Sequence, residues 1–435
     1  MLKDKKTYKI VTLGCKVNAY EADAIAENFN HLGYMPAKND DKVDIAIVNT
    51  CSVTSTSDQK SRQQIRRLIT KHPEATIVVM GCYSQINQNL ASEIPDIDVV
   101  VGTSNRHKIA ELVEKHRVTK QQIVAVEKDA RLFDYEELNY TSVTNHARAY
   151  LKIQDGCDNF CTFCIIPLTR GRLRSRQPHE VIKEAQDLVK KGYKEIVLTG
   201  IHTGGYGRDL PDYSFTSLVK DILVSCPDLF SLRISSIEEN EITDELIGII
   251  KSDKRMAHHL HIPLQAGSDE ILKKMNRHYD TRQFTEKIEA IRRIVPDIAI
   301  TTDVIVGFPG ETDELFEETV HTIRRLNFAE MHVFPYSIRT RTPAAKMKAQ
   351  IDPQIKKARV HKLIELSDHL KSLYYQKFNG RILEVLIENQ ETKTGLYYGH
   401  TSNYMLVRIN ATEDVKHKVV SVVFSSDGVS QIIDA

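Results

Sequence analysis

One short segment of the chain carries three closely spaced cysteines and reads Asp155-Gly156-Cys157-Asp158-Asn159-Phe160-Cys161-Thr162-Phe163-Cys164. This C-x3-C-x2-C spacing offers three thiolates from one loop. A structural zinc site requires four protein ligands, whereas a cubane iron–sulfur cluster held by three thiolates leaves one iron open to another molecule. The count of three therefore favours a cluster with an open iron. Two alternatives remain at this point: a zinc ion with a distant fourth ligand, and three ordinary thiols.

Composition limits the class of protein. A chain of 435 residues is expected to form two or three domains. The formal net charge is only +1, so any contact with RNA must be local. Seven cysteines, no apolar leader and no apolar run of about 18 residues predict a cytoplasmic protein without disulfides or membrane spans.

The first third of the sequence alternates apolar runs with helical patterns, which predicts a small parallel α/β domain. The expected strands are Tyr8–Leu13, Val43–Val48, Thr76–Met80 and Asp98–Val101. The helices expected to follow them are Ala19–Leu32, Thr56–Ile69, Gln85–Ile94 and Arg106–Val113.

A cysteine follows each of the first three strands, at Cys15, Cys51 and Cys82. Ligands of open parallel sheets bind beyond the carboxyl ends of the strands, so we expect these thiols to converge. Glycines before Cys15 and Cys82 fit tight turns that bring the backbone close to a ligand. The pattern predicts a second cluster. The alternative is that each cysteine is a small buried apolar residue.

Strand and helix patterns resume after a polar stretch and predict a parallel barrel of six β/α units, which is incomplete. Its expected strands are Arg148–Gln154, Glu195–Thr199, Leu232–Ser236, His259–Leu264, Ala299–Val306 and Met331–Pro335. In such barrels the active site lies at the carboxyl ends of the strands. Asp352-Pro353 is expected to open a long helix.

Two groups of basic residues lie near these strands. Arginine occurs at every second position from Arg170 through Arg172 and Arg174 to Arg176, and in an extended segment these side chains would line one side. This predicts a local patch for an anionic partner such as RNA. Strand alternation also places His259 and His261 on one face, but no carboxylate stands at ligand spacing, so no metal site is predicted there.

The last sixty residues change to short β runs, expected at Ile382–Ile387, Tyr404–Ile409 and Val419–Phe424. A small β-barrel is predicted. Six Lys or Arg against seven Asp or Glu from Tyr374 onward give no basic signal for RNA. Tyr397, Tyr398 and Tyr404 could stack on bases or belong to the core.

Several segments together resemble the radical S-adenosylmethionine (SAM) methylthiotransferase family. They are the three strand-end cysteines, the Gly156–Cys164 segment, Arg170-Gly171, His261-Ile262-Pro263-Leu264-Gln265, Thr302–Glu311 and Gly399–Tyr404. The resemblance covers nearly the whole chain. It implies a methylthiotransferase domain at 1–118, a linker at 119–142, a radical SAM core at 143–373 and a TRAM domain at 374–435. Ala266 replaces a common serine, and the TRAM segment lacks a glycine expected near His417.

The resemblance also implies the cofactors: two 4Fe–4S clusters and SAM. Cys157, Cys161 and Cys164 would be catalytic and hold the SAM-binding cluster, and Cys15, Cys51 and Cys82 would hold a cluster that supplies sulfur. Residues expected to contact SAM are Phe163, Thr199, Gly200, Ser236, Gln265, Asp303 and Gly307. Arg170, Arg172, Arg174 and Arg176 would hold tRNA phosphates.

The implied activity is the addition of a methylthio group to an adenine in tRNA. Residues Leu13 to Glu21 resemble the branch that modifies C2 of N6-threonylcarbamoyladenosine at position 37 of the anticodon loop. The alternatives are isopentenyladenosine in tRNA and an aspartate of a ribosomal protein. The expected partners are tRNA and a low-potential electron donor such as flavodoxin or ferredoxin, and the chain is expected to be a monomer.

Overall fold

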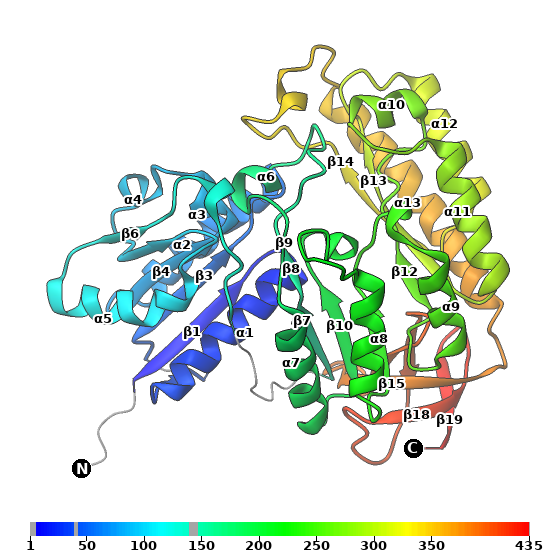
Figure 1. Ribbon diagram of the computed structural model, residues 1–435, viewed down its shortest axis with the longest axis horizontal. Helices are drawn as coiled ribbons and strands as arrows, with labels where there is room; N and C mark the ends of the chain where they lie inside the picture. The colour runs from blue at the N-terminus through cyan, green and yellow to red at the C-terminus, as the bar shows by residue number, and fades with distance from the viewer. Residues whose placement is uncertain (1–5, 39–41, 139–146, 435) are drawn as a thin grey trace. The chain divides into compact units, whose positions relative to one another are not determined.

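The computed structural model describes residues 6–38, 42–138 and 147–434 (Figure 1). The chain forms two compact units. The first contains Met1–Thr144, Lys152–Glu184 and Ser337–Ala345, and the second contains Asn145–Leu151, Ala185–Tyr336 and Lys346–Ala435. The predicted boundary between linker and barrel, at residues 142 and 143, lies outside the described residues.

A six-stranded parallel sheet organises the first unit, in the order β2-β1-β3-β4-β5-β6. Its strands are β1 (Thr7–Thr12), β2 (Met35–Pro36), β3 (Ile45–Thr50), β4 (Thr76–Gly81), β5 (Val99–Val101) and β6 (Ile123–Ala125). Every residue of β3 and β4 is buried, as expected for continuous apolar runs at the centre of a parallel sheet. The predicted α/β domain is confirmed.

Helices cover this sheet and form two apolar cores, one with Phe29 and Ile47 and the other with Val48 and Ile65. The helices are α1 (Lys16–His31), α2 (Ser55–Lys71), α3 (Cys82–Ile86), α4 (Leu90–Glu93) and α5 (Ile109–Thr119), with the 3-10 turn η1 (Arg106–Lys108). The prediction of one helix over Gln85–Ile94 is wrong. The chain leaves helical geometry at Asn87, which divides the segment into α3 and α4.

The remainder of the first unit carries the closely spaced cysteines. A short antiparallel pair, β8 (Gln154–Asp155) with β9 (Arg174–Ser175), closes the loop that contains them. Helix α6 (Ile166–Thr169) follows the third cysteine, and the 3-10 turn η2 (Ala130–Leu132) lies beside α6. Helix α7 (Pro178–Lys190) leads out of this region into the second unit.

The second unit holds the predicted partial barrel. Two three-stranded sheets have the orders β11-β10-β7 and β12-β13-β14, and a parallel bridge joins Leu232 to Met256. The strands are β7 (Arg148–Lys152), β10 (Glu195–Thr199), β11 (Ser231–Ile234), β12 (His259–His261), β13 (Ala299–Val306) and β14 (Glu330–Pro335). All six strands expected from the sequence are present.

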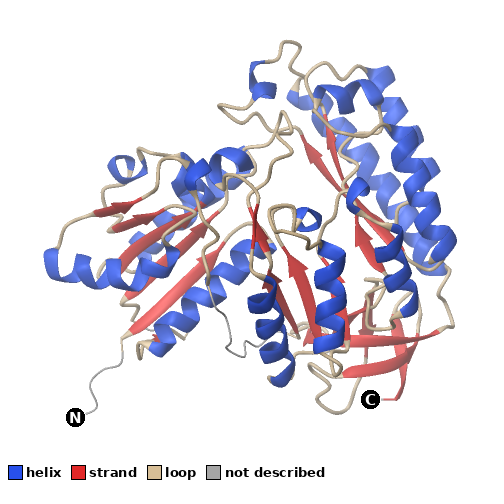
Figure 2. Cartoon of the chain, in the orientation of Figure 1, coloured by secondary structure: helices blue, strands red, loops and turns tan. Residues whose placement is uncertain are grey.

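Helices of the second unit lie along one side of its strands (Figure 2). They are α8 (Phe215–Ser225), α9 (Asp244–Ser252), α10 (Asp269–Lys274), α11 (Thr281–Ile294), α12 (Asp313–Leu326) and α13 (Pro353–Gln376), with 3-10 turns η3 (Thr203–Gly205), η4 (Glu239–Glu241) and η5 (Pro343–Lys346), the last lying across both units. Asp352 caps α13 and Pro353 is its first residue, as predicted. None of the helices in the described part of the chain is long and apolar enough to cross a membrane.

The C-terminal strands close into a five-stranded barrel, in the order β15-β16-β17-β19-β18, around a core that includes Val385, Val407 and Val422. The strands are β15 (Ile382–Gln390), β16 (Tyr397–Thr401), β17 (Leu406–Ile409), β18 (Val419–Val423) and β19 (Val429–Asp434). The predicted small β-barrel is confirmed, although β16 and β19 were not among the expected strands. Tyr397 belongs to the core.

Candidate functional site

The carboxyl ends of three neighbouring strands bring Cys15, Cys51 and Cys82 together. Each cysteine lies within three residues of the end of β1, β3 or β4, and these strands are adjacent in the sheet. A Cβ atom added at Gly14 would lie 3.0 Å from the Cys51 sulfur. Burial raises the pKa of the Cys82 thiol to about 11, and repulsion from Cys51 and Cys15 adds to this rise, whereas Arg170 opposes it. The three thiols therefore converge as the strand pattern predicts.

Backbone geometry at this site requires glycine at two positions. Gly14 has φ +100° and Gly81 has φ +103°, a region that other residues rarely adopt. A Cβ at Gly81 would approach the carbonyl oxygen of Thr50 to 2.5 Å. These glycines let the chain turn sharply from strand into helix with the following cysteine at the turn.

Cys157, Cys161 and Cys164 lie in the loop between β8 and α6 and are all partly exposed. The Asn159 N–H donates a hydrogen bond to the Cys157 sulfur, with an N–S distance of 3.5 Å. Gly156 has φ +71°, and a Cβ there would lie 1.8 Å from the carbonyl oxygen of Arg172. The loop is thus folded back closely upon the segment that follows it.

A cavity of about 220 Å³ opens beside this loop. Its lining includes Phe160, Cys161, Cys164, Arg172, Arg341 and Pro343. Phe160 is 47% exposed, and the Arg172 guanidinium lies 5.1 Å from the centre of its ring. Two of the loop thiols therefore face a space bordered by an exposed aromatic ring and an exposed cation.

The donor sets bear on the ligand that each group of thiols could hold. The two cysteine trios are Cys15, Cys51 and Cys82 at the strand ends and Cys157, Cys161 and Cys164 in the loop. Each trio offers three thiolates, one fewer than the four protein ligands of a structural zinc site. Thiolates are the ligands of iron–sulfur clusters, so both donor sets fit such a cluster.

Arg170 links the surroundings of the two cysteine trios and is completely buried. Its guanidinium donates to Glu21 Oε1 at 2.8 Å, to Asn18 Oδ1 at 2.8 Å and to Asp155 at 3.2 Å. Asn18 is three residues from Cys15, and Asp155 is two residues from Cys157. One side chain therefore bonds to a neighbour of each trio.

The predicted basic patch along the alternating arginines is wrong for three of its four members. Arg170 and Arg176 are fully buried in ion pairs, Arg176 with Glu184 and Glu137. Arg174 is also buried and donates to the carbonyl oxygens of Arg170 and Arg172. The extended strand β9 spans only two residues, so the four arginines do not share one side of a strand. The side chains of the three buried arginines point inward to carboxylates. Only Arg172, whose side chain is 58% exposed, matches the expectation.

The buried charges around Arg170 nearly balance. The cations are Arg106, Lys152, Arg170 and Arg174, and the carboxylates are Glu21, Glu136 and Asp155. Burial alone would raise the pKa of Glu21. The cations Arg106, Arg170 and Lys152 lower this pKa by more than burial raises it, so the carboxyl stays ionised. The pKa of Asp155 is likewise held well below its usual range by its cationic neighbours. The group has one excess positive charge beside the strand-end thiols.

Phe163 lies in the cysteine loop and is partly buried. The remaining predicted site residues lie at the carboxyl ends of the barrel strands, with one exception. Thr199 ends β10, Gly200 follows it, Ser236 follows β11, Gln265 follows β12 and Gly307 follows β13. Gln265 and Gly307 both have positive φ, and the Gly307 N–H donates to Glu311. Asp303 instead lies within β13.

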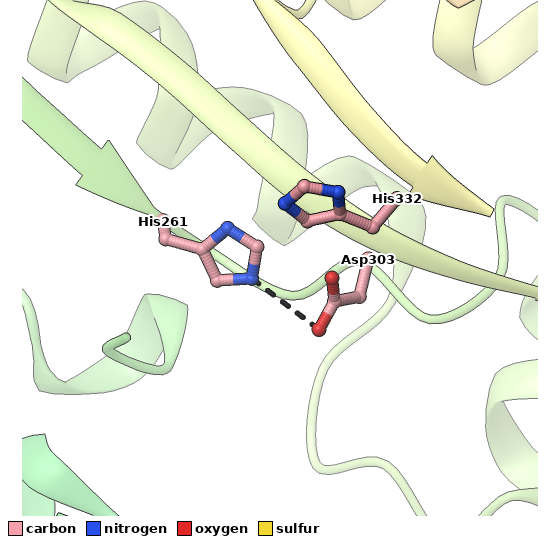
Figure 3. A group of neighbouring side chains, drawn as sticks. All are labelled: His261, Asp303 and His332. Carbon is pink, nitrogen blue, oxygen red and sulfur yellow. Dashed lines mark ion pairs between the residues drawn. The ribbon is translucent and has the colours of Figure 1, made fainter. Parts of the chain in front are cut away.

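Asp303 belongs to a group with His261 and His332 that sequence reasoning missed (Figure 3). These residues come from β13, β12 and β14, respectively. The alternation of His259 and His261 was the available signal. The carboxylate and the second imidazole are on other strands, so no local spacing could reveal them.

A three-thiolate loop and a partial parallel β/α barrel are the features that the resemblance to radical SAM proteins implies. The model of the radical SAM superfamily matches residues 151–323, and that of uncharacterized protein family UPF0004 matches residues 7–102. The radical SAM methyltransferase TsrM of Kitasatospora setae has a similar fold, with TM-score 0.58, 13% identity and coverage of 78% of this chain and 74% of that one.

Similar sequences specify the family. Threonylcarbamoyladenosine tRNA methylthiotransferase MtaB of Bacillus subtilis is 47% identical over 94% of this chain and 92% of its own length. A tRNA-2-methylthio-N(6)-dimethylallyladenosine synthase of Caldicellulosiruptor saccharolyticus is 35% identical over 96% of this chain and 89% of its own length. The chain belongs to the radical SAM tRNA methylthiotransferase family, whose enzymes use a 4Fe–4S cluster and SAM.

Proposed function

We propose that this chain adds a methylthio group to C2 of N6-threonylcarbamoyladenosine at position 37 of the tRNA anticodon loop. The observation that carries this proposal is the 47% identity, over nearly the whole chain, to a relative named for that activity. Five dimethylallyladenosine synthases are 33–36% identical to this chain. Isopentenyladenosine in tRNA and a ribosomal-protein aspartate are the alternative substrates.

Two clusters are proposed for the two cysteine trios. Cys157, Cys161 and Cys164 would hold the SAM-binding cluster, with Phe163 against it, and Cys15, Cys51 and Cys82 would hold the second. When bound, SAM and the clusters supply a radical that removes hydrogen from the adenine and the sulfur that replaces it. The residues of the chain position these groups, since a reactive radical requires its target to be held in place.

The chain's own residues have distinct proposed tasks around the cysteine loop. The Asn159 N–H donates to the Cys157 sulfur and would stabilise the negative charge of the Cys157 thiolate. Arg172 would hold a phosphate of the anticodon loop, because it is the exposed arginine of its series. Phe160, beside Arg172, offers a face for stacking an unpaired base.

SAM contacts are proposed for the strand ends of the barrel. Thr199 and Gly200 would contact the methionyl amine of SAM, Ser236 and Gln265 its ribose or carboxylate, and Gly307 its adenine. Asp303 is a further candidate for the adenine. The support for this proposal is that ligands of parallel β/α barrels bind at the carboxyl ends of the strands.

Further partners follow from the proposed chemistry. We propose a low-potential one-electron donor such as flavodoxin or ferredoxin, because the cleavage of SAM by a reduced cluster consumes one electron. We also propose that the chain acts in the cytoplasm, because its proposed substrate is tRNA, and that it works as a monomer.

Mass spectrometry of tRNA nucleosides tests the proposed substrate. A strain lacking this chain should lose 2-methylthio-N6-threonylcarbamoyladenosine and retain the unmethylthiolated nucleoside, and the wild-type chain should restore it. Loss of the methylthio derivative of isopentenyladenosine would contradict the proposal. So would unchanged tRNA with loss of methylthio-aspartate from a ribosomal protein.

A further inference from the structure

The register of three neighbouring strands brings His261, Asp303 and His332 to one face of the sheet. In the parallel pairing, His261 lies opposite Thr301 and Asp303 lies opposite His332. Thr301 and Asp303 are two residues apart on β13, so their side chains point to the same side. The backbone therefore requires the two imidazoles and the carboxylate to share a face.

The side chains also point toward a common place, as Figure 3 shows. One ligand atom from each residue lies within 4.8 Å of the other two. His261 Nε2 is 3.3 Å from Asp303 Oδ2, and the rings of His261 and His332 have centres 5.8 Å apart. His261 and Asp303 are partly buried and His332 is exposed, so the group is open to solvent on one side.

Thr301 holds the first imidazole in position. Its hydroxyl lies 3.0 Å from His261 Nδ1 and 2.9 Å from His259 Nε2. The opposite nitrogen of His261, Nε2, is thereby directed at Asp303. A hydrogen bond to the second ring nitrogen is the usual way in which a protein orients a metal-binding histidine.

We propose that His261, Asp303 and His332 bind a divalent transition-metal ion, either Zn²⁺ or Fe²⁺. Two imidazole nitrogens and one carboxylate oxygen form the ligand set of catalytic zinc sites and of non-haem iron sites, and both leave coordination positions open. An ordinary histidine–carboxylate pair explains the contact of His261 with Asp303. It does not explain why a third ligand, the imidazole of His332, comes to the same point from another strand.

The open positions suggest a role, which rests on the proposed function. The threonyl part of the proposed substrate carries a carboxylate, which the nearby carboxylate of Asp303 would repel. A divalent cation between the two carboxylates would attract both, and the substrate carboxylate could occupy one of its open coordination positions. The metal would then favour threonylcarbamoyladenosine over adenosine that lacks this group.

Zinc content tests the site itself. The full chain, reconstituted with iron and sulfide, is dialysed against buffered free Zn²⁺, and bound zinc is measured by elemental analysis. His332→Ala and Asp303→Asn should each bind about one zinc fewer than the wild type. Thr301→Val should weaken zinc binding about 10–100-fold. His361→Ala, an exposed histidine on α13, serves as the matched control and should bind as the wild type.

Equal zinc content in wild type, His332→Ala and Asp303→Asn overturns the metal site. Iron content and circular dichroism show whether each variant is folded, and His332→Gln replaces His332→Ala if the latter is not. If zinc content is equal in all three proteins, the other role proposed for Asp303, direct contact with SAM, is favoured.

Stem-loop binding tests the role. His332→Ala should weaken binding of an anticodon stem-loop containing threonylcarbamoyladenosine about tenfold, an effect of about 1.4 kcal/mol, and leave a stem-loop with plain adenosine unchanged. Equal weakening of both stem-loops overturns carboxylate recognition. If the enzyme forms no methylthio nucleoside but zinc still depends on His332, the proposed function fails while the metal site stands.

Discussion

The two cysteine trios reach similar ligand sets by opposite routes. Cys157, Cys161 and Cys164 fall within eight residues of one loop, whereas Cys15, Cys51 and Cys82 are gathered from the ends of three strands. The loop trio therefore depends on local backbone geometry and the strand-end trio on the register of a whole sheet. Arg170 bonds to neighbours of both, so its loss should disturb the two together.

Replacing Arg170 should have the largest effect on both trios. Arg170→Leu removes the hydrogen bonds to Glu21, Asn18 and Asp155, while Arg106 and Lys152 still pair with both carboxylates, so we expect a cost of about 1.5–3 kcal/mol. Urea unfolding of the metal-free chain measures the loss. Arg172→Ala, an exposed arginine two residues away, should change stability by less than about 1 kcal/mol. Equal stability of the two variants would contradict the role of Arg170.

Gly81→Ala should disturb the strand-end trio, Cys15, Cys51 and Cys82, and leave the loop trio unchanged. Gly81 combines φ +103° with ψ −160°, a region essentially confined to glycine, so an alanine there costs about 1–3 kcal/mol. The new Cβ would also press on the Thr50 carbonyl, so the chain must shift at Cys82. We expect iron to fall from about eight to about four per chain, while SAM cleavage persists. Gly33→Ala has a similar φ but open space around the added Cβ, so it should retain all iron. Full iron content in Gly81→Ala would show that the strand end tolerates the shift.

Alkylation of the reduced, metal-free chain should reveal a smaller difference between the trios, in the reaction rates of their thiols. Cys82 is buried and burial raises its pKa to about 11, so its thiolate is scarce at pH 8. We expect Cys82 to react at least about tenfold more slowly than the partly exposed Cys161, as measured by peptide mass spectrometry. Comparable rates at pH 8 would contradict this burial.

The same thiol predicts the direction of the alkaline stability change. The pKa of Cys82 in the folded chain exceeds its ordinary value of 9, so the unfolded chain loses this proton first. The contribution of Cys82 to stability is therefore complete below pH 9 and is lost as the pH rises from 9 to 11. In Cys82→Ser, the urea concentration at the midpoint of unfolding should change less between pH 9 and pH 11 than in the wild type. An unchanged pH dependence of this midpoint would count against the shifted pKa.

Much of the architecture could be predicted because its signals are local. Strand and helix periods indicated the α/β domain and the barrel, and a cysteine after each of three strands indicated their convergence. The arginine series misled because its partners, among them Glu21, are distant in the sequence. His332 was missed for a related reason: its proximity to His261 is set by strand pairing and not by spacing along the chain.

A paired cysteine substitution tests most directly the claim that the trios hold two clusters with separate roles. Cys161→Ala should lose about four irons and all SAM cleavage. Cys51→Ala should also lose about four irons, yet cleave SAM and fail to form the methylthio nucleoside. If both variants lose SAM cleavage equally, or if either loses all its iron, the two-cluster account is contradicted.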